Sequence, residues 1–477
     1  MIGRLAAGAA GRIEGLLNED RIGLAVTGLS RAGKTVFITS LVHNLLALGA
    51  AGRGRDTLPL FTAALRTPDG DNRLRGIRIL PPDGGLPQFD YAGKLASLAA
   101  DTPAWPEPTQ SLAQISLAIT LDRRSPVARF TGPRRVRLDI LDYPGEWLLD
   151  LPLLQRDFAR WSAETLALLR TKPRAEIAGR FLTWLGHLRA ADPPDATTLA
   201  HGAGLYRASL RDAAARGLRY LQPGRFLAPP AADDPDFLTF FPLEGGGPTA
   251  ALLAARFAGY QRDMRRRFFD THFRRFDRQV MLVDLLSALH AGRAAFEDTA
   301  RAISDIASGL RHGWGHGLKL DGLPLAHHIP PVLLGGRVVP RPIGRVAFVA
   351  TKADHVPALR RENLRNLLRA IVARGTAAAG SAVSHHVAAA VLATEDATAR
   401  IGDRPTEVVR GVLLGETQAR AFHVGDVPSA IPPDGFWAES FFSLPVFRPP
   451  RIIADGSHGI PHLGLDAILT ELIGDRL

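Results

Sequence analysis

Residues 28–35, GLSRAGKT, follow the pattern G-x-x-x-x-G-K-S/T, in which two glycines frame a loop that ends in a lysine and a hydroxyl residue. The short run before them, residues 21–27 (RIGLAVT), predicts a buried strand. Apolar residues at helical spacing come after the loop, and Gly49 can end that helix. Strand, glycine-rich loop and helix in this order are typical of a phosphate-binding loop. The alternative is an ordinary glycine turn beside a surface lysine.

Lysine is rare in this chain, which strengthens the interpretation of the loop. Of the 58 Lys and Arg residues only five are lysines, and Lys34 is one of them. In a phosphate-binding loop Lys34 would reach the β- and γ-phosphates of a nucleotide, and the Thr35 hydroxyl would bind Mg²⁺.

A second motif lies at the end of another predicted strand, in residues 134–147 (RRVRLDILDYPGEW). Residues 142–145 (DYPG) fit the pattern D-x-x-G. A carboxylate at the carboxyl end of a strand lies beside the phosphate loop in a doubly wound sheet. We therefore expect Asp142 to hold Mg²⁺ through a water molecule and the Gly145 N–H to meet the γ-phosphate. The alternative is an Asp-Pro-Gly turn.

A third motif ends the strand predicted over residues 345–350, where residues 351–354 read TKAD and resemble the guanine motif N-K-x-D. Asp354 would accept both N–H groups of the guanine edge, and the Lys352 stem would lie over the base. Adenine offers no such donor pair, so Asp354 favours GTP. A backbone contact to the guanine oxygen is expected near Ala393 and Thr394, after a strand predicted over residues 386–392.

A mobile segment is expected between the first helix and the D-x-x-G strand. Thr109 follows a proline, just before a strand predicted over residues 112–121 that could form a hairpin with residues 135–141. A threonine at this place in regulatory GTPases senses Mg²⁺ and the γ-phosphate, so Thr109 is the candidate. A proline-rich surface loop is the alternative.

The segment LDILDYPG, residues 138–145, is similar to the corresponding segment of Ras-like small GTPases. Together with GLSRAGKT, RQVMLVDLLSALHAG (residues 278–292), ATKADHV (350–356) and the closing LDAILTELIGDRL, it resembles the YcjX-like family of bacterial P-loop proteins over nearly the whole chain. The resemblance implies a Ras-like nucleotide domain with a large helical insertion, stress-linked expression and an undefined cellular role. Proteins of this family are often labelled ATPases, whereas the TKAD motif favours guanine; the motifs themselves predict GTP or GDP as the ligand, with Mg²⁺ as cofactor.

Two departures from Ras concern the chemistry. Glu146 stands where Ras-like enzymes carry the glutamine that positions the attacking water; a carboxylate can orient water but repels the γ-phosphate, so slow hydrolysis is expected. Arg31 lies inside the loop, where it could neutralise a phosphate, pair with Glu146 or point outward. No arginine lies close to Thr109 in sequence, so a built-in arginine finger is not evident there.

The predicted site residues fall into three sets. The catalytic set is Lys34, Gly145 and Glu146, and the metal set is Thr35, Thr109 and Asp142. The nucleotide-binding set is Gly28, Ser30, Arg31, Ala32, Gly33, Lys34, Thr35, Val36, Thr109, Thr351, Lys352, Asp354, His355, Ala393 and Thr394.

The predicted fold is α/β: a three-layer P-loop NTPase, with a Ras-like mixed sheet covered by helices on both faces and an inserted all-α domain. Residues 1–147 would form the first part of the P-loop domain, 148–277 the helical insertion and 278–477 the second part. The alternative is that the helices belong to the core of one domain. Asp284 ends a predicted central strand, either as a second site carboxylate or, as we favour, as a local cap.

Composition narrows the remaining choices. The chain has no cysteine, which excludes a disulfide scaffold, a zinc–thiolate site and a cysteine nucleophile. The formal net charge of +11 comes mostly from scattered arginines, with one dense run at residues 262–278. We interpret that run as an amphipathic helix with an apolar stripe and a solvated basic face. Docking to a membrane or an acidic protein is the alternative, and specific nucleic-acid binding is disfavoured. A cytoplasmic location is expected, with membrane association at the inner face as the alternative.

These observations predict a Mg²⁺-dependent protein that hydrolyses GTP slowly and acts as a GTP/GDP switch, in a bacterial stress response if the family resemblance holds. An unidentified protein partner is expected. The alternatives are an ATPase of a stress-associated complex, or a nucleotide-dependent adaptor that docks a membrane or protein partner through the helical insertion.

Overall fold

The computed structural model describes residues 19–50, 57–82, 85–109, 112–123, 132–188, 195–227, 238–266, 276–313, 343–376, 382–439 and 442–477. The N-terminal residues 1–18, the histidine-containing stretch 314–342 and most of the basic run lie outside these ranges.

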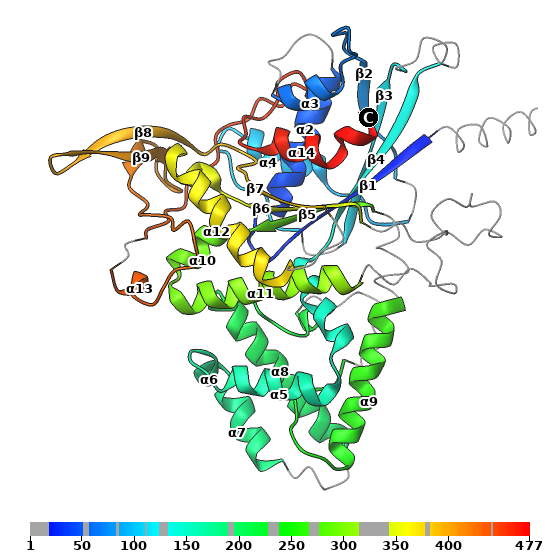
Figure 1. Cartoon of the computed structure of the whole chain (residues 1–477), viewed down its shortest axis with the longest axis vertical. Helices are drawn as coiled ribbons and strands as arrows, with labels where there is room; N and C mark the ends of the chain where they lie inside the picture. Colours follow the sequence, from blue (N-terminus) through cyan, green and yellow to red (C-terminus); the bar gives the residue numbers. More distant parts are fainter. Residues whose placement is uncertain are drawn as a thin grey trace, which may run out of the picture.

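A seven-stranded sheet with the order β2-β3-β4-β1-β5-β6-β7 forms the centre of the molecule (Figure 1). Strands β4, β1, β5, β6 and β7 run parallel, whereas β3 is antiparallel to both β2 and β4. The expected hairpin between β3 and β4 is therefore confirmed. The strands are β1 (Glu19–Gly28), β2 (Leu74–Ile79), β3 (Ala113–Leu121), β4 (Arg134–Asp142), β5 (Arg278–Val283), β6 (Arg345–Ala350) and β7 (Ala382–Val387).

Helices cover both faces of this sheet (Figure 1). On one face, alternate β1 residues such as Ile22 and Leu24 share a buried cluster with Phe37 of α2 and Leu469 of α14. On the other face, β-strand residues pack with α11 and α12. The helices outside the β4–β5 connection are α2 (Lys34–Gly49), α3 (Pro59–Ala64), α4 (Tyr91–Ala99), α10 (Leu285–His290), α11 (Arg293–Gly313), η8 (Ala353–His355), α12 (Ala358–Thr376), α13 (Phe436–Glu439), α14 (Leu465–Ile473) and η9 (Gly474–Arg476).

The connection from β4 to β5 is helical and lies beyond α11 from the sheet (Figure 1). Its aromatic core surrounds Trp161, which is fully buried. The buried cluster continues from these helices through α11 to the sheet. The domain limits 148 and 277 stay predictions. The elements are η2 (Gly145–Gln155), α5 (Phe158–Leu169), α6 (Arg174–Ile177), α7 (Gly179–His187), α8 (Ala196–Ala215), η3 (Gly224–Phe226) and α9 (Pro248–Asp263).

A second, three-stranded sheet of order β10-β9-β8 extends from the carboxyl side of β7. It consists of β8 (Thr394–Ile401), β9 (Arg404–Val412) and β10 (Ala419–Phe422). The sequence predicts strands over residues 407–415 and 421–427, which correspond within a few residues to β9 and β10, whereas β8 was not predicted.

Several predicted elements differ in extent. Apolar residues at helical spacing predict one helix over residues 148–171. The structure instead has the 3-10 helix η2 and the α-helix α5 there, because Pro152 lacks an N–H and Asp157 caps α5 by accepting the Arg160 N–H at 2.8 Å. The sequence also predicts a long helix near residues 250–276. It is α9 up to Asp263 and a π-helical turn over residues 264–266, and residues 267–275 lie outside the described part of the chain. In the described part of the chain, no helix is long and apolar enough to cross a membrane.

Candidate functional site

The loop between β1 and α2 has the backbone shape of a phosphate-binding loop. Arg31 and Gly33 both adopt left-handed backbone angles, with φ of 68° and 84°. A Cβ at Gly33 would meet no neighbour, so glycine is required there by conformation rather than by space. Gly33 is also the N-cap of α2, and no side chain caps this helix. The helix therefore presents its N-terminus through backbone groups alone, as anion sites do.

Lys34 and Asp142 lie together at the carboxyl ends of neighbouring strands. The parallel register of β1 and β4 places Val26 opposite Asp142. The Lys34 Nζ is 2.7 Å from Asp142 Oδ1. The other oxygen, Asp142 Oδ2, is buried and accepts no hydrogen bond from the described residues. Burial raises the pKa of the Asp142 carboxyl, and the Lys34 ammonium opposes this rise.

Thr109 reaches the loop from a distant part of the sequence. Its hydroxyl lies 3.1 Å from the Thr35 Oγ1, and its backbone N–H donates to the same oxygen at 3.1 Å. Two hydroxyls and a carboxylate are oxygen ligands of the kind that Mg²⁺ prefers. The partnerless Asp142 Oδ2 supplies an acceptor for a metal-bound water. These three residues therefore fit a Mg²⁺ ion, with Asp142 in the outer position.

Gly145 brings the D-x-x-G backbone into direct contact with the loop. A Cβ at Gly145 would lie 2.1 Å from the carbonyl oxygen of Gly28 and 2.9 Å from the Leu29 nitrogen. Backbone atoms cannot move aside as a flexible side chain can, so only glycine fits at this contact. The Gly145 main chain therefore lies against the start of the loop.

Glu146 is half-buried in the first turn of η2, and Arg31 is exposed. Among the described residues no ion pair joins these two side chains, so the expected alternative of an Arg31–Glu146 pair has no support. The main chain of Glu146 instead faces Gly224, where a Cβ would lie 1.8 Å from the Glu146 carbonyl oxygen. The D-x-x-G segment is thus held between the loop and the helical connection.

The TKAD motif follows β6, two strands from β1 in the sheet. Thr351 donates its hydroxyl and its N–H to the carbonyl oxygen of Val283 on β5. Lys352 has a left-handed backbone, with φ of 60°, and its Nζ lies 2.5 Å from Asp284 Oδ2. Asp284 also caps α10 by accepting the Ser287 N–H at 2.9 Å. The favoured prediction of a local cap is confirmed, and the same carboxylate also anchors Lys352.

Asp354 joins the TKAD motif to the residues expected to contact the guanine oxygen. It is 2% exposed, and its Oδ2 accepts the Ala393 N–H at 2.9 Å. The Thr394 hydroxyl donates to the Asp354 carbonyl oxygen at 2.5 Å. Strand β7 ends at Val387, earlier than predicted, yet Ala393 and Thr394 still reach this motif. The neighbouring His355 packs against the Phe447 ring, and burial lowers the pKa of its imidazole.

The structure therefore gathers the predicted residues into two groups at one edge of the sheet. Between them lies β5, where a Cβ at Gly28 would be 2.7 Å from the Leu282 carbonyl oxygen. Ser30 is exposed, Ala32 is buried, and the Val36 side chain packs in a separate apolar cluster, so Val36 could offer only its backbone. The loop group is Gly28, Ser30, Arg31, Ala32, Gly33, Lys34, Thr35, Val36, Thr109, Asp142, Gly145 and Glu146, and the base group is Thr351, Lys352, Asp354, His355, Ala393 and Thr394.

Sequence reasoning missed one buried joint next to the site. Asp150 on η2 is fully buried and accepts hydrogen bonds from the backbone N–H groups of Gly224 and Arg225 and from the Tyr260 hydroxyl. An aspartate within a leucine-rich stretch was the only signal, and spacing alone could not name its partners. This joint ties the D-x-x-G segment to η3 and α9.

Comparison with known proteins identifies the family of this chain. A family model described as the YcjX-like family, DUF463, matches residues 22–477. A protein of Escherichia coli named Ras-like GTPase YcjX is 33% identical over 472 residues, covering 95% of each chain. A protein of the same name from Shewanella oneidensis is 32% identical over 482 residues, covering 95% of this chain and 94% of its own. The chain belongs to the YcjX-like family.

Proposed function

We propose that this protein is a Mg²⁺-dependent GTPase that works as a GTP/GDP switch. The observation that carries the proposal is the place of Asp354, a buried carboxylate held by the Ala393 N–H at the same sheet edge as the phosphate loop. Its chemistry suits the paired N–H donors of guanine. The name of the relatives, Ras-like GTPase, supports the same assignment.

The residues of the loop group have complementary roles in this proposal. The backbone N–H groups at the start of α2 hold the β-phosphate, and Lys34 exchanges its contact with Asp142 for the β- and γ-phosphates. Thr35, Thr109 and Asp142 would hold Mg²⁺, which neutralises charge on the phosphate oxygens. Because Thr109 already contacts Thr35, its segment senses whether this site is filled.

Hydrolysis needs a water molecule in line with the bond that breaks. Water attacks the γ-phosphorus, the bond from that phosphorus to the bridging oxygen breaks, and the bonding electrons remain on GDP. Gly145 offers its N–H to the γ-phosphate, and Glu146 orients the water. The Glu146 carboxylate also repels the phosphate, which makes turnover slow. In Glu146→Gln we expect faster hydrolysis, measured as phosphate release, because the negative charge is lost while the side chain can still hydrogen-bond the water. A tenfold fall in the hydrolysis rate would instead show that Glu146 acts as a base.

The guanine preference has a sharp test in Asp354→Asn. Xanthine has a carbonyl oxygen where guanine has its amino group, and an asparagine amide can donate to it. The asparagine oxygen can keep the bond from Ala393. Calorimetry with Mg²⁺ should show that the parent binds GDP more tightly than ADP. Asp354→Asn should lose at least about 100-fold in GDP affinity and gain xanthosine diphosphate.

A matched control and a contrary outcome complete this test. Asp403→Asn removes the same charge from an exposed turn between β8 and β9, and it should bind GDP like the parent. ADP binding as tight as GDP binding would refute the guanine preference and favour the ATPase alternative.

The cellular setting belongs to the same proposal. We place the protein in the cytoplasm, with residues 148–277 as a helical insertion that meets a protein partner and with a role in stress. The second candidate function, a nucleotide-dependent adaptor, is favoured by the buried joint at Asp150, because that joint couples the D-x-x-G segment to the helical connection. Membrane docking is tested by pelleting with anionic vesicles in GDP and in a GTP analogue.

A further inference from the structure

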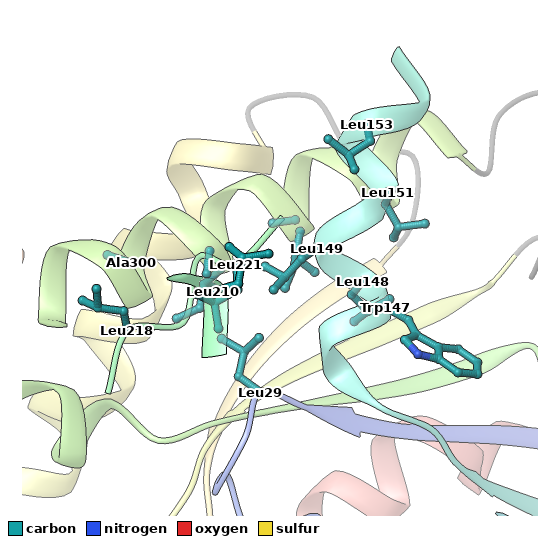
Figure 2. Close-up of a cluster of buried hydrophobic side chains, with 14 of the residues drawn as sticks. Leu29, Trp147, Leu148, Leu149, Leu151, Leu153, Leu210, Leu218, Leu221 and Ala300 are labelled. Carbon is teal, nitrogen blue, oxygen red and sulfur yellow. The ribbon is translucent and has the colours of Figure 1, made fainter. Parts of the chain in front are cut away.

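The stretch between α8 and η3, residues 216–223, shares its buried core with the phosphate loop. Leu29 of the loop shares one buried cluster with Leu218 and Leu221 of this stretch, and Figure 2 draws them together with Leu210 of α8. Each of the three is at most 5% exposed. The stretch is therefore part of the same apolar core as the loop that would hold the phosphates.

Hydrogen bonds anchor the backbone of this stretch on its other sides. The buried Asp298 of α11 accepts the N–H groups of Arg219 and Tyr220 on one oxygen, at 2.5 and 2.8 Å. The Gln222 amide donates to the Leu149 carbonyl oxygen on η2 at 2.7 Å. Because α11 and η2 hold the main chain of this stretch, the position of the Arg219 Cα is well defined.

The Arg219 side chain is a half-buried cation that has no acidic partner among the described residues. Its Nη1 donates only to the carbonyl oxygens of Ala214 and Leu218, at 3.3 and 3.1 Å. Within the described part of the chain, no carboxylate lies at ion-pair distance from this guanidinium. Burial lowers the pKa of Arg219, and the charge of Arg31 adds to the effect. Arginine keeps its proton at neutral pH, so the protein holds two cations close together here.

The surroundings of Arg219 place it over the nucleotide edge of the sheet. Besides Asp298, the charges that act on its guanidinium are those of Arg31, Glu146 and Asp284. These three residues follow β1, β4 and β5, which are neighbours in the sheet. Gly224, which follows in the same segment, lies against the main chain of Glu146, so this stretch borders the strand ends where ligands bind in such sheets.

We propose that Arg219, together with Arg31, contacts the phosphates of the bound nucleotide, so that the helical connection supplies a phosphate-binding arginine within the same chain. This inference rests on the proposed GTPase function. A polyphosphate would be the negatively charged partner of the Arg219 guanidinium. A guanidinium can also stabilise the charge that develops on the phosphate oxygens as the bond breaks. It also explains why an arginine-bearing stretch is packed against the loop itself.

The test compares Arg219→Gln, Arg219→Lys and the control Arg216→Gln in the full-length protein. Arg216 is an exposed arginine at the end of α8 and undergoes the same change of charge. The probes are GDP and a non-hydrolysable GTP analogue, each with Mg²⁺, by calorimetry, and GTP in single-turnover hydrolysis. Circular dichroism and thermal denaturation check that each variant folds.

Arg219→Gln should weaken binding of the GTP analogue at least about tenfold, with a smaller effect on GDP, and should slow single-turnover hydrolysis about 100-fold. Arg219→Lys should recover part of the binding, because the charge returns without the planar fork. Arg216→Gln should behave like the parent. A role limited to capping α8 would not change the ratio of the two affinities.

Three results would count against the inference in different ways. If Arg219→Gln and Arg216→Gln both match the parent, Arg219 does not contact phosphate, and the GTPase proposal stands. If Arg219→Gln loses GDP and the analogue equally together with thermal stability, and lysine rescues nothing, its role is structural. If the parent itself binds no guanine nucleotide, the proposed function falls and this inference falls with it.

Discussion

Replacing Asp150 by alanine should destabilise the protein by about 3–5 kcal/mol, because one buried carboxylate serves three donors on two elements. Its Oδ1 accepts the Gly224 N–H at 2.7 Å, and its Oδ2 accepts the Arg225 N–H at 3.1 Å and the Tyr260 hydroxyl at 2.6 Å. Hydrogen bonds to a charged group contribute about 1.5–3 kcal/mol each, and part of that gain offsets the cost of burying the charge. Alanine leaves the three donors without an acceptor.

The assay is urea unfolding followed by tryptophan fluorescence, since Trp147 on η2 and Trp161 on α5 are both buried. Tyr260→Phe is the matched variant. It removes one donor and leaves Asp150 two backbone N–H groups, so it should cost about 1.5 kcal/mol, at most half of the alanine effect. Equal losses in the two variants would refute this explanation of the joint.

The pH dependence gives an independent check with a defined sign. Burial raises the pKa of Asp150 in the folded protein to about 6, from an ordinary value of 3.8. Between pH 3.8 and about 6 the folded state binds a proton that the unfolded state does not. This proton binding stabilises the folded state; the stabilisation is complete below pH 3.8 and is lost as the pH rises through 6. The parent should gain about 1.4 kcal/mol over Asp150→Ala between pH 7.5 and pH 5. A gap that narrows toward pH 5 would show that burial does not raise this pKa.

Gly145→Ala should abolish nucleotide binding in calorimetry, because the new Cβ would lie 2.1 Å from a backbone carbonyl oxygen of the loop. The control Gly76→Ala should bind like the parent, because its Cβ would have no neighbour nearer than 3.8 Å. Thr109→Ala should raise the Mg²⁺ concentration needed for binding of a GTP analogue about tenfold, measured by titration with fluorescent nucleotide; an unchanged requirement would remove Thr109 from the metal site. Lys34→Ala should lose GTP hydrolysis and at least about 100-fold in GTP-analogue affinity, and retained binding would contradict the assigned role of the loop.

The strands that carry the motifs could be predicted because burial leaves a clear pattern in the sequence. Every residue of β5, Arg278–Val283, is buried, and its last four residues, VMLV, form the continuous apolar run that is typical of a parallel strand. Because polar residues such as Asp142 come at the ends of such runs, the edge of the sheet that gathers them could be inferred. The same logic located residues 351–354 after β6.

Other features depend on tertiary contacts that leave no local pattern. Strand β2 (LRGIRI) is a half-buried edge strand with a glycine and two arginines, so neither alternation nor hydrophobicity marks it. Arg219 lies at the end of a helical stretch and looks like any other arginine of this chain. The burial of Leu218 and Leu221 in the same cluster as Leu29, together with the backbone hydrogen bonds to Asp298, brings it to the site.

The contacts around Gly145 and Gly224 give a physical route from the nucleotide to the helical connection. Gly145 lies against the backbone of Gly28, and Gly224 lies against the backbone of Glu146. No side chain at either glycine can turn aside to absorb a displacement, since each contact joins main chain to main chain. If loss of the γ-phosphate releases Gly145, Glu146 moves with it, and Gly224 must either follow or lose its hydrogen bond to Asp150. Hydrolysis is therefore expected to shift η3 and α9, which makes the helical connection the part of the molecule best placed to report the nucleotide state to a partner.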